Sequence, residues 1–371
     1  MSAIADIDTR TRELLERYGF AEPRFEELRG RVASGELSPA SNVVVGEVEP
    51  LRDGDGVALP ERGTQAYAEA WEAGRDALRR GRVASVVLAG GMATRFGGLV
   101  KGVVEAHDGR SFLSWKLGET ARLGAQLDAE IATAVMTSFS TDDVTRAHVA
   151  DLDVPEPIWF SQFVSLRLVA DGSLFRGDDG AVSPYAPGHG DLVEAIRVSG
   201  AAAALRERGV DLVAVSNVDN LGARLDPVVI GTHLLGGAAM TSEVARKEGD
   251  MGGAPARVDG RLVLLEAPCF PPDFDPDRIP VFNTNTATFD LAVFDRAYDL
   301  TWLYVEKNVD GRSAVQLEHL YHELASFVPA RFVEVPRSGP RGRFFPIKTP
   351  GELDRAQAGL AEMLAATPLD D

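Results

Sequence analysis

Residues 84–102 read ASVVLAGGMATRFGGLVKG, and this stretch predicts the centre of the fold. The apolar, β-branched run at 86–88 is typical of a buried strand. The strand stops at the glycine pair 90–91, where the missing side chains let backbone N–H groups approach an anion. Arg95 and Lys101 then supply positive charge suited to a polyphosphate. The stretch therefore predicts a strand that leads into a nucleotide-binding loop.

Two common nucleotide motifs do not fit this loop. A glycine pair after a strand also occurs in ordinary turns, for steric reasons alone. The spacing is not Gly-x-Gly-x-x-Gly, and Lys101 is not followed by Ser or Thr. A dinucleotide-dependent dehydrogenase is therefore disfavoured.

Length and composition limit the class of protein. The 371 residues are 45% hydrophobic, enough for one large domain or two ordinary ones. A formal net charge of −18 argues against a nucleic-acid partner. The single cysteine, Cys269, excludes an intramolecular disulfide and a cysteine cluster for zinc. No membrane-length apolar stretch occurs and the first residues are acidic, so we expect a cytoplasmic protein without membrane contact.

The pattern along the chain predicts two regions. Residues 1–82 are charged with helical spacing, which indicates an N-terminal helical cap on a catalytic domain at 83–371. In the second region strands alternate with helices, which predicts an α/β fold with a doubly wound, mostly parallel sheet and ligands at the carboxyl ends of its strands. The predicted strands are 84–89, 131–137, 157–163, 210–216, 238–245, 261–267 and 284–289, and the predicted helices are 113–124, 191–208, 226–236, 314–327 and 350–365.

Two turns carry polar groups that suit a ligand. In Ala-Pro-Gly-His-Gly-Asp (186–191), Asp191 is placed to cap a helix, whereas His189 between two glycines has little to pack against. In Ser-Asn-Val-Asp-Asn-Leu-Gly (216–222), a strong strand ends at carboxylate and amide groups. That turn is either a common Asx-rich turn or a site for a hard cation, with Asp219 as the carboxylate.

Four further polar residues allow a structural and a functional interpretation. Gln162 is either a buried amide with structural hydrogen bonds or a reader of the uracil edge. Glu266 ends an apolar strand, where it needs either an ion pair or a hydroxyl-rich sugar. Asn283 and Asn285 are two residues apart in a strand, so we expect them on one face.

Taken in order, these segments resemble the UTP–glucose-1-phosphate uridylyltransferase family over roughly residues 84–356. The resemblance rests on the glycine loop, PGHGD (187–191), NVDNLG (217–222), NTN (283–285) and VPRSGPRGRFFPIKT (335–349). It implies a nucleotidyltransferase fold, the substrates UTP and a hexose 1-phosphate, and the cofactor Mg²⁺. It implies roles for the following residues: Lys101, Lys348 and Arg95 in catalysis; Leu88, Gly90, Gly91, Gln162, Gly188 and Asn217 in nucleotide binding; His189, Lys247, Glu266, Asn283 and Asn285 in sugar-phosphate binding; and Asp219 as metal ligand.

The chain also departs from the family pattern. Val100 replaces the usual proline before the loop lysine, and the loop begins Leu-Ala-Gly-Gly, as in the related N-acetylhexosamine enzymes. The segment 286–288 reads Thr-Ala-Thr in place of Asn-Leu-Trp, and the loop at 243–253 is one residue short. The alternatives are a UDP-N-acetylhexosamine or broad UDP-sugar pyrophosphorylase, or a non-catalytic UDP-sugar-binding paralogue. After Lys348 we expect no room for the C-terminal β-helix domain of eukaryotic members.

Overall fold

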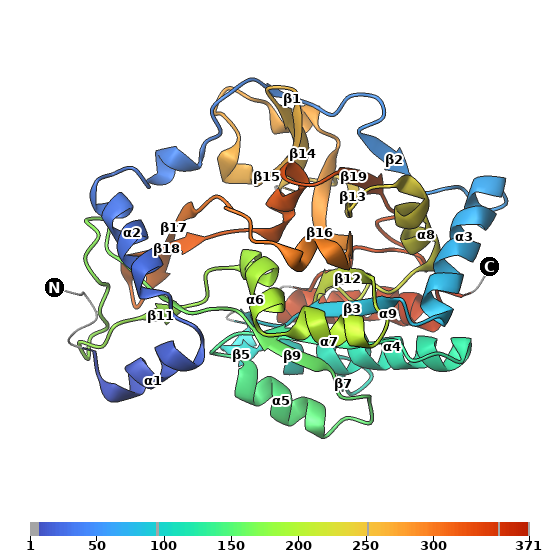
Figure 1. Cartoon of the computed structure of the whole chain (residues 1–371), viewed down its shortest axis with the longest axis horizontal. Coiled ribbons are helices and arrows are strands. Elements are labelled where there is room, and N and C mark those ends of the chain that lie inside the picture. The colour runs from blue at the N-terminus through green and yellow to red at the C-terminus, as the bar shows by residue number, and fades with distance from the viewer. Residues whose placement is uncertain (1–6, 94–95, 251, 348, 370–371) are drawn as a thin grey trace.

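An eight-stranded sheet forms the centre of the computed structural model (Figure 1), which describes residues 7–93, 96–250, 252–347 and 349–369. The strand order is β2-β19-β13-β16-β12-β3-β8-β9. Their bounds are β2 Gly56–Ala58, β19 Ala330–Glu334, β13 Met240–Arg246, β16 Val281–Asp290, β12 Leu212–Asn217, β3 Val83–Leu88, β8 Thr133–Thr137 and β9 Ile158–Ser161. β16 runs antiparallel to β12 and β13, and the other described pairings in this sheet are parallel. The predicted mostly parallel α/β sheet is confirmed.

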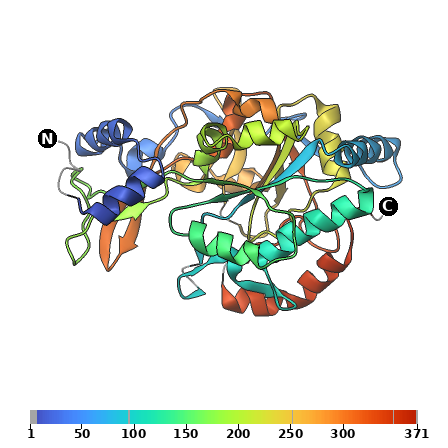
Figure 2. The same cartoon turned by 60° about the horizontal axis from the view of Figure 1, so that its bottom comes forward.

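Helices cover both faces of the sheet (Figure 2). Their bounds are α1 Thr9–Arg17, α2 Glu22–Ala33, α3 Gln65–Arg79, α4 Phe112–Leu127, α5 Asp142–Ala150, α6 Leu192–Val198, α7 Ala201–Glu207, α8 Pro227–Gly236 and α9 Pro350–Ala365. Val87 packs with side chains of α4 and α9, whereas Val86 and Leu88 pack with α6 and α7. Because side chains alternate along a strand, one apolar run supplies two hydrophobic cores.

Smaller sheets lie beside the central one. β1 (Val48–Glu49), β14 (Ala254–Val258) and β15 (Arg261–Leu265) form a three-stranded sheet, so the predicted strand 261–267 lies outside the central sheet. The two-stranded sheets are β17 (Leu303–Val309) with β18 (Arg312–Glu318), β10 (Ser165–Leu166) with β11 (Pro184–Tyr185), β4 (Met92–Ala93) with β5 (Leu99–Val100), and β6 (Glu105–His107) with β7 (Arg110–Ser111).

The first 82 residues contact two different parts of the molecule. α1 and α2 pack on side chains of the β10–β11 and β17–β18 sheets. α3 packs closely against α8, where a Cβ added to Gly231 would lie 1.7 Å from the Ala70 carbonyl oxygen. β2 meanwhile joins the edge of the central sheet. The domain boundary at residue 82 therefore stays a proposal.

Two helix predictions need correction. The predicted helix 191–208 is divided into α6 and α7 at Gly200, whose φ of +83° is left-handed. The predicted helix 314–327 is wrong, because residues up to Glu318 form β18 and a 3₁₀ helix, η8 (Tyr321–Ser326), follows. Pairing with β17 over the full length of β18 decides the strand, and this partner is not visible in the local pattern.

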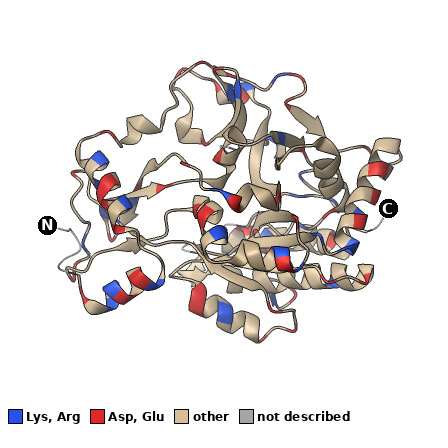
Figure 3. Ribbon diagram, in the orientation of Figure 1, with Lys and Arg blue, Asp and Glu red and all other residues tan. Residues whose placement is uncertain are grey.

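Charge lies mainly on the outer helices, whereas the central strands are largely uncharged (Figure 3). α1 and α2 carry interleaved basic and acidic residues, and β3 has none. Among the described helices, none is both long and apolar enough to cross a membrane.

Candidate active site

The predicted nucleotide loop begins where β3 ends at Leu88. Ser138 Oγ donates to the Gly90 carbonyl oxygen at 2.8 Å and Thr141 Oγ1 donates to that of Ala89 at 3.0 Å. A Cβ on Gly90 would lie 2.1 Å from Gln162 Oε1, so a side chain there would displace the Gln162 amide. A Cβ added to Gly91 would have no neighbouring atom within 4 Å. The first glycine therefore leaves room for the Gln162 amide, and the second borders open space.

The structure brings Gln162 and Gly188 together. Gln162 follows β9, is 6% exposed, and donates through Nε2 to the Gly188 carbonyl oxygen. Gly188 has a φ of +100°, and a Cβ there would lie 2.9 Å from the His319 carbonyl oxygen. Two residues predicted to read uracil, 26 positions apart in the chain, thus share one hydrogen bond.

His189 begins a single 3₁₀ turn, η4 (His189–Asp191). The Tyr321 backbone N–H donates to His189 Nδ1 at 3.4 Å, and the His189 ring centroid lies 5.3 Å from that of His322. Burial, with the nearby His322 and His319, lowers the pKa of His189 well below its ordinary value. His189 is therefore uncharged at neutral pH.

Asp191 does not act as the predicted helix cap. It stands at the N-cap position of α6, but its side chain makes no capping hydrogen bond. Its carboxylate accepts from the Phe163 backbone N–H at 2.9 Å and contacts His319 Nε2 at 2.6 Å. Asp191 therefore joins the turn at 187–191 to the residue after Gln162.

The turn after β12 carries Asp219, whose carboxylate forms an ion pair with Lys101 Nζ. Lys101 begins the 3₁₀ turn η3 (Lys101–Val103), and the two side chains are 21% and 10% exposed. Asn217 Oδ1 accepts from Asn285 Nδ2 at 2.9 Å. Asn220 donates to the Arg343 carbonyl oxygen at 3.1 Å and accepts from the Phe345 N–H at 2.8 Å. The turn is thereby fastened to β16 and to the 343–345 segment.

The donor set around Asp219 fits a magnesium ion that arrives with phosphates. Within the described part of the chain, no group of three or more His, Cys, Asp or Glu side chains could enclose a metal. Mg²⁺ commonly binds one or two carboxylates and takes its other ligands from water and substrate phosphates. A single partly exposed carboxylate such as that of Asp219 would be sufficient for such an ion.

Two of the predicted sugar residues, Asn283 and Asn285, lie at a bulge in β16. The register between β13 and β16 shifts at Glu243/Val244, opposite 283–286. Asn285 has a φ of +54°, a conformation that asparagine tolerates better than most residues. Its backbone N–H donates to Asn283 Oδ1 at 3.1 Å. Glu266 Oε1 lies 3.0 Å from His322 Nε2, a partner that no sequence motif indicated.

Three further predicted residues are Lys247, Arg95 and Lys348. Lys247 Nζ donates to the Pro276 carbonyl oxygen at 2.6 Å, so its ammonium group is engaged away from the other predicted sugar residues. Arg95 and Lys348 lie outside the described residues.

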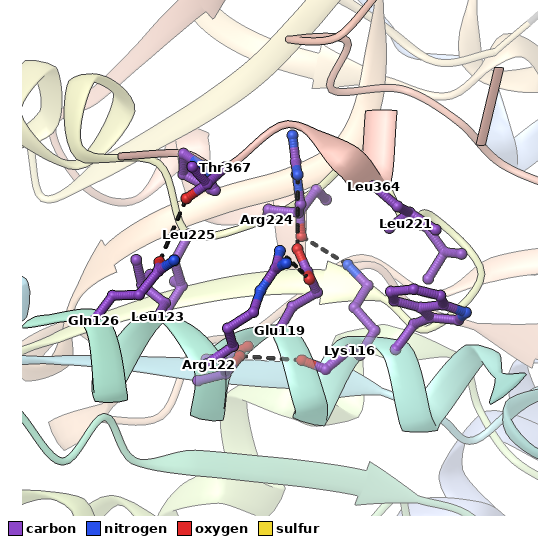
Figure 4. Close-up of a pocket in the computed structure, with 15 residues that line it drawn as sticks. Lys116, Glu119, Arg122, Leu123, Gln126, Leu221, Arg224, Leu225, Leu364 and Thr367 are labelled. Atoms are coloured by element: carbon purple, nitrogen blue, oxygen red, sulfur yellow. Dashed lines mark hydrogen bonds and ion pairs between the residues drawn. The ribbon is translucent and has the colours of Figure 1, made fainter. Parts of the chain in front are cut away.

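A second lysine, missed by the sequence analysis, contacts the Asp219 turn at its two ends. Lys116 Nζ donates to Ser216 Oγ at 3.0 Å and to the Ala223 carbonyl oxygen at 2.7 Å. Figure 4 shows Lys116 extending from α4 toward the segment that contains Arg224, beside a cavity of about 20 Å³. Burial, followed by the charge of Arg343, lowers the pKa of Lys116 to about 7. A lysine in a helical pattern normally lies on a solvent-exposed face, so the sequence around Lys116 did not indicate that this side chain is buried.

Nearby, a buried ion pair fastens the segment that follows β19. Arg343 contacts both carboxylate oxygens of Glu243 at 2.6 Å, and the two side chains are 6% and 2% exposed. Arg343 also donates to the Arg224 carbonyl oxygen at 3.0 Å. Arg343 thus joins β13 to the segment that follows the Asp219 turn.

The model of one protein family, described as UTP–glucose-1-phosphate uridylyltransferase, matches residues 38–363. The chain belongs to this family. A uridylyltransferase of that name from Saccharomyces cerevisiae is 31% identical over 73% of this chain and 58% of its own length. The chain spans about 60% of the length of the first curated relatives that it matches.

Solved structures agree with the family on the fold. A UDP-glucose pyrophosphorylase mutant from Leishmania major superposes with a TM-score of 0.74 at 23% identity, covering 95% of this chain and 80% of that one. A UDP-N-acetylglucosamine pyrophosphorylase from Trypanosoma brucei gives a TM-score of 0.77 at 17% identity over the same shares, 95% and 80%. The nucleotidyltransferase fold implied by the sequence motifs is confirmed.

Proposed function

We propose that this family member is a uridylyltransferase that converts UTP and glucose 1-phosphate into UDP-glucose and pyrophosphate. The observation that carries the proposal is the Lys101–Asp219 pair at the carboxyl ends of β3 and β12, where this fold class binds ligands. The Gly90–Gln162–Gly188 contact lies at the same edge of the sheet. Family membership supports the same reaction.

The chemistry requires no general base. A phosphate oxygen of the sugar phosphate forms the new bond to the α-phosphorus as the bond to the leaving pyrophosphate breaks. The nucleophile is already anionic near neutral pH, because the second pKa of a phosphate monoester is about 6. Uncharged His189 accepts at Nδ1, so its ring proton is on Nε2. That N–H can donate to the sugar phosphate without taking a proton from it.

The charged residues then align and neutralise the reacting phosphates. Asp219 would hold Mg²⁺, which supplies charge neutralisation on phosphate oxygens when bound. Lys101 now pairs with Asp219, and it would exchange this partner for the triphosphate. Arg95 and Lys348 are proposed as further phosphate contacts, and Leu88, Gly90 and Gly91 as backbone contacts of the nucleotide.

The Gln162–Gly188 contact supports a uracil-binding role for both residues. Both residues present amide groups, and a wrong base edge would leave buried polar groups unpaired. A site of this kind discriminates by about 10⁴-fold. We expect a strong preference for UTP over ATP and CTP, measured as kcat/KM. Equal rates with ATP would contradict the assignment of both residues.

A pyrophosphate-release assay with UTP and a panel of sugar 1-phosphates tests the proposal. We expect glucose 1-phosphate to give the highest kcat/KM, galactose 1-phosphate a lower one, and N-acetylglucosamine 1-phosphate the lowest. The reverse order of glucose and N-acetylglucosamine would favour an N-acetylhexosamine enzyme. Binding of UDP-glucose without pyrophosphate release from any sugar would indicate a non-catalytic UDP-sugar-binding protein.

A further inference from the structure

His322 lies between two residues that are proposed to bind the sugar. It belongs to η8, and its side chain is 3% exposed. Its Nδ1 lies 3.3 Å from Asn283 Nδ2, and its Nε2 lies 3.0 Å from Glu266 Oε1. Its ring centroid also lies 5.3 Å from that of His189. One buried ring therefore contacts three predicted sugar-phosphate residues from separate parts of the chain.

The hydrogen-bond partners assign the proton on this ring. Asn283 Oδ1 accepts from the Asn285 backbone N–H, so the amide N–H₂ of Asn283 faces His322. His322 Nδ1 must then accept, and in the neutral ring the proton is on Nε2. This N–H is close to Glu266 Oε1 but not aligned with it, and it has no hydrogen-bond partner among the described residues. A buried donor without a partner costs free energy unless a ligand or a shift of Glu266 satisfies it.

The same contacts continue to the turn that carries Asp219. Asn285 Nδ2 donates to Asn217 Oδ1 at 2.9 Å. A series of polar contacts therefore runs from Asn217 through Asn285, Asn283 and His322 to Glu266. Displacement of His322 would remove the hydrogen-bond partner of the Asn283 amide and the ring that packs beside the Glu266 carboxylate.

His322 and Glu266 also line a cavity of about 400 Å³. Most of the remaining lining is apolar, and it includes Val44, Val263, Leu265 and Leu303. His322 and Glu266 thus stand where a predicted sugar residue borders a largely apolar space, which could take an apolar substituent of a larger sugar.

We propose that His322 is a specificity-determining residue for the hexose 1-phosphate. It positions Asn283 and Glu266 toward the sugar hydroxyls, and it closes the sugar site against the apolar cavity. This inference rests on the proposed function. The sugar excluded by His322 is an N-acetylated hexose 1-phosphate, whose acetamido methyl suits an apolar lining.

Substitution of His322 tests the proposal through substrate preference. In His322→Ala we expect the KM for glucose 1-phosphate to rise about 10-fold while the KM for UTP stays within about twofold. We expect the kcat/KM of N-acetylglucosamine 1-phosphate relative to glucose 1-phosphate to rise at least about 10-fold. His322→Gln, which keeps bulk and an amide N–H near Glu266, should recover most of the glucose preference. An unchanged sugar ratio in His322→Ala would overturn the proposal.

His233 provides a matched control. It is also buried, with a side chain 1% exposed, and its two nitrogens contact Thr241 Oγ1 at 2.8 Å and Asp290 Oδ1 at 3.2 Å. His233→Ala should lower the melting temperature without changing the sugar ratio. The same change of ratio in both variants would make the effect of His322 a general loss of packing and overturn its specific role.

A binding measurement separates this inference from the proposed function. If the unmodified protein releases no pyrophosphate from any sugar, the proposed function fails. Calorimetric titration with UDP-glucose and UDP-N-acetylglucosamine then still compares the unmodified protein with His322→Ala. A shift of the affinity ratio toward the N-acetylated ligand supports the role of His322, and an unchanged ratio overturns it.

Discussion

Lys101 and Lys116 contact the same turn, at its middle and at its two ends, and their surroundings differ. Lys101 pairs with the Asp219 carboxylate, and both side chains keep some exposure to solvent. Lys116 is buried and donates to a hydroxyl and a carbonyl, which carry no charge to balance its own. The ammonium group of Lys101 can leave its carboxylate partner and bind a phosphate instead. The ammonium group of Lys116 is buried among neutral groups, so it can only hold the conformation of the turn.

The largest effect is expected at Asp219. Asp219→Ala should lower kcat by about 10³-fold in saturating magnesium, because the proposed protein ligand of the metal is lost. Steady-state pyrophosphate release measures this, and circular dichroism checks the fold. Asp211→Ala, at the opposite end of β12 in an exposed pair with Arg82, should keep its activity. Full turnover of Asp219→Ala in magnesium would refute the metal assignment.

Lys101→Ala should have the next largest effect. We expect kcat and kcat/KM to fall together by about 10²-fold, as for the loss of one preorganised charge in the transition state. The control is Lys307→Ala, a lysine of β17 that pairs with Glu318 at 3.5 Å, and its kinetics should be unchanged. A change confined to KM would reduce Lys101 to a ground-state binding residue.

Lys116 should instead control stability as a function of pH. Its pKa is lowered to about 7 in the folded protein. Between pH 7 and the ordinary pKa of lysine, the unfolded chain therefore binds more protons than the folded protein. Stability then rises with pH, by about 2 kcal/mol from pH 7 to pH 9. Lys116→Met should remove this contribution, and urea unfolding at both pH values measures the difference. Parallel pH dependence in the two proteins would show that Lys116 titrates normally.

The smallest effect is expected on the kcat of the Lys116→Met variant. Lys116→Met keeps the turn in place through Asn217 and Asn220, so we expect kcat to fall by less than about 10-fold. The concentration of magnesium for half-maximal activity should rise more than the KM for UTP. A loss as large as that of Lys101→Ala would remove the distinction between the two lysines.

The local sequence determined much of this protein. The run at 86–88, the glycine pair and the polar turns at strand ends each act over a few residues, so strand periodicity and motif order were sufficient for the α/β sheet and the family. The sequence placed Lys101 and Asp219 separately in the two loops, and the parallel pairing of β3 with β12 puts those loops at the same edge of the sheet.

Only the tertiary structure decided the rest. The segment 312–318 is a strand because β17 pairs with it. The side chain of Asp191 bonds to Phe163 and His319 and does not cap its helix. The burial of Lys116 and the position of His322 between Asn283 and Glu266 depend on elements far apart in the chain. Desolvation and ion pairing depend on what surrounds a group in space, and a residue's own sequence neighbours do not report that.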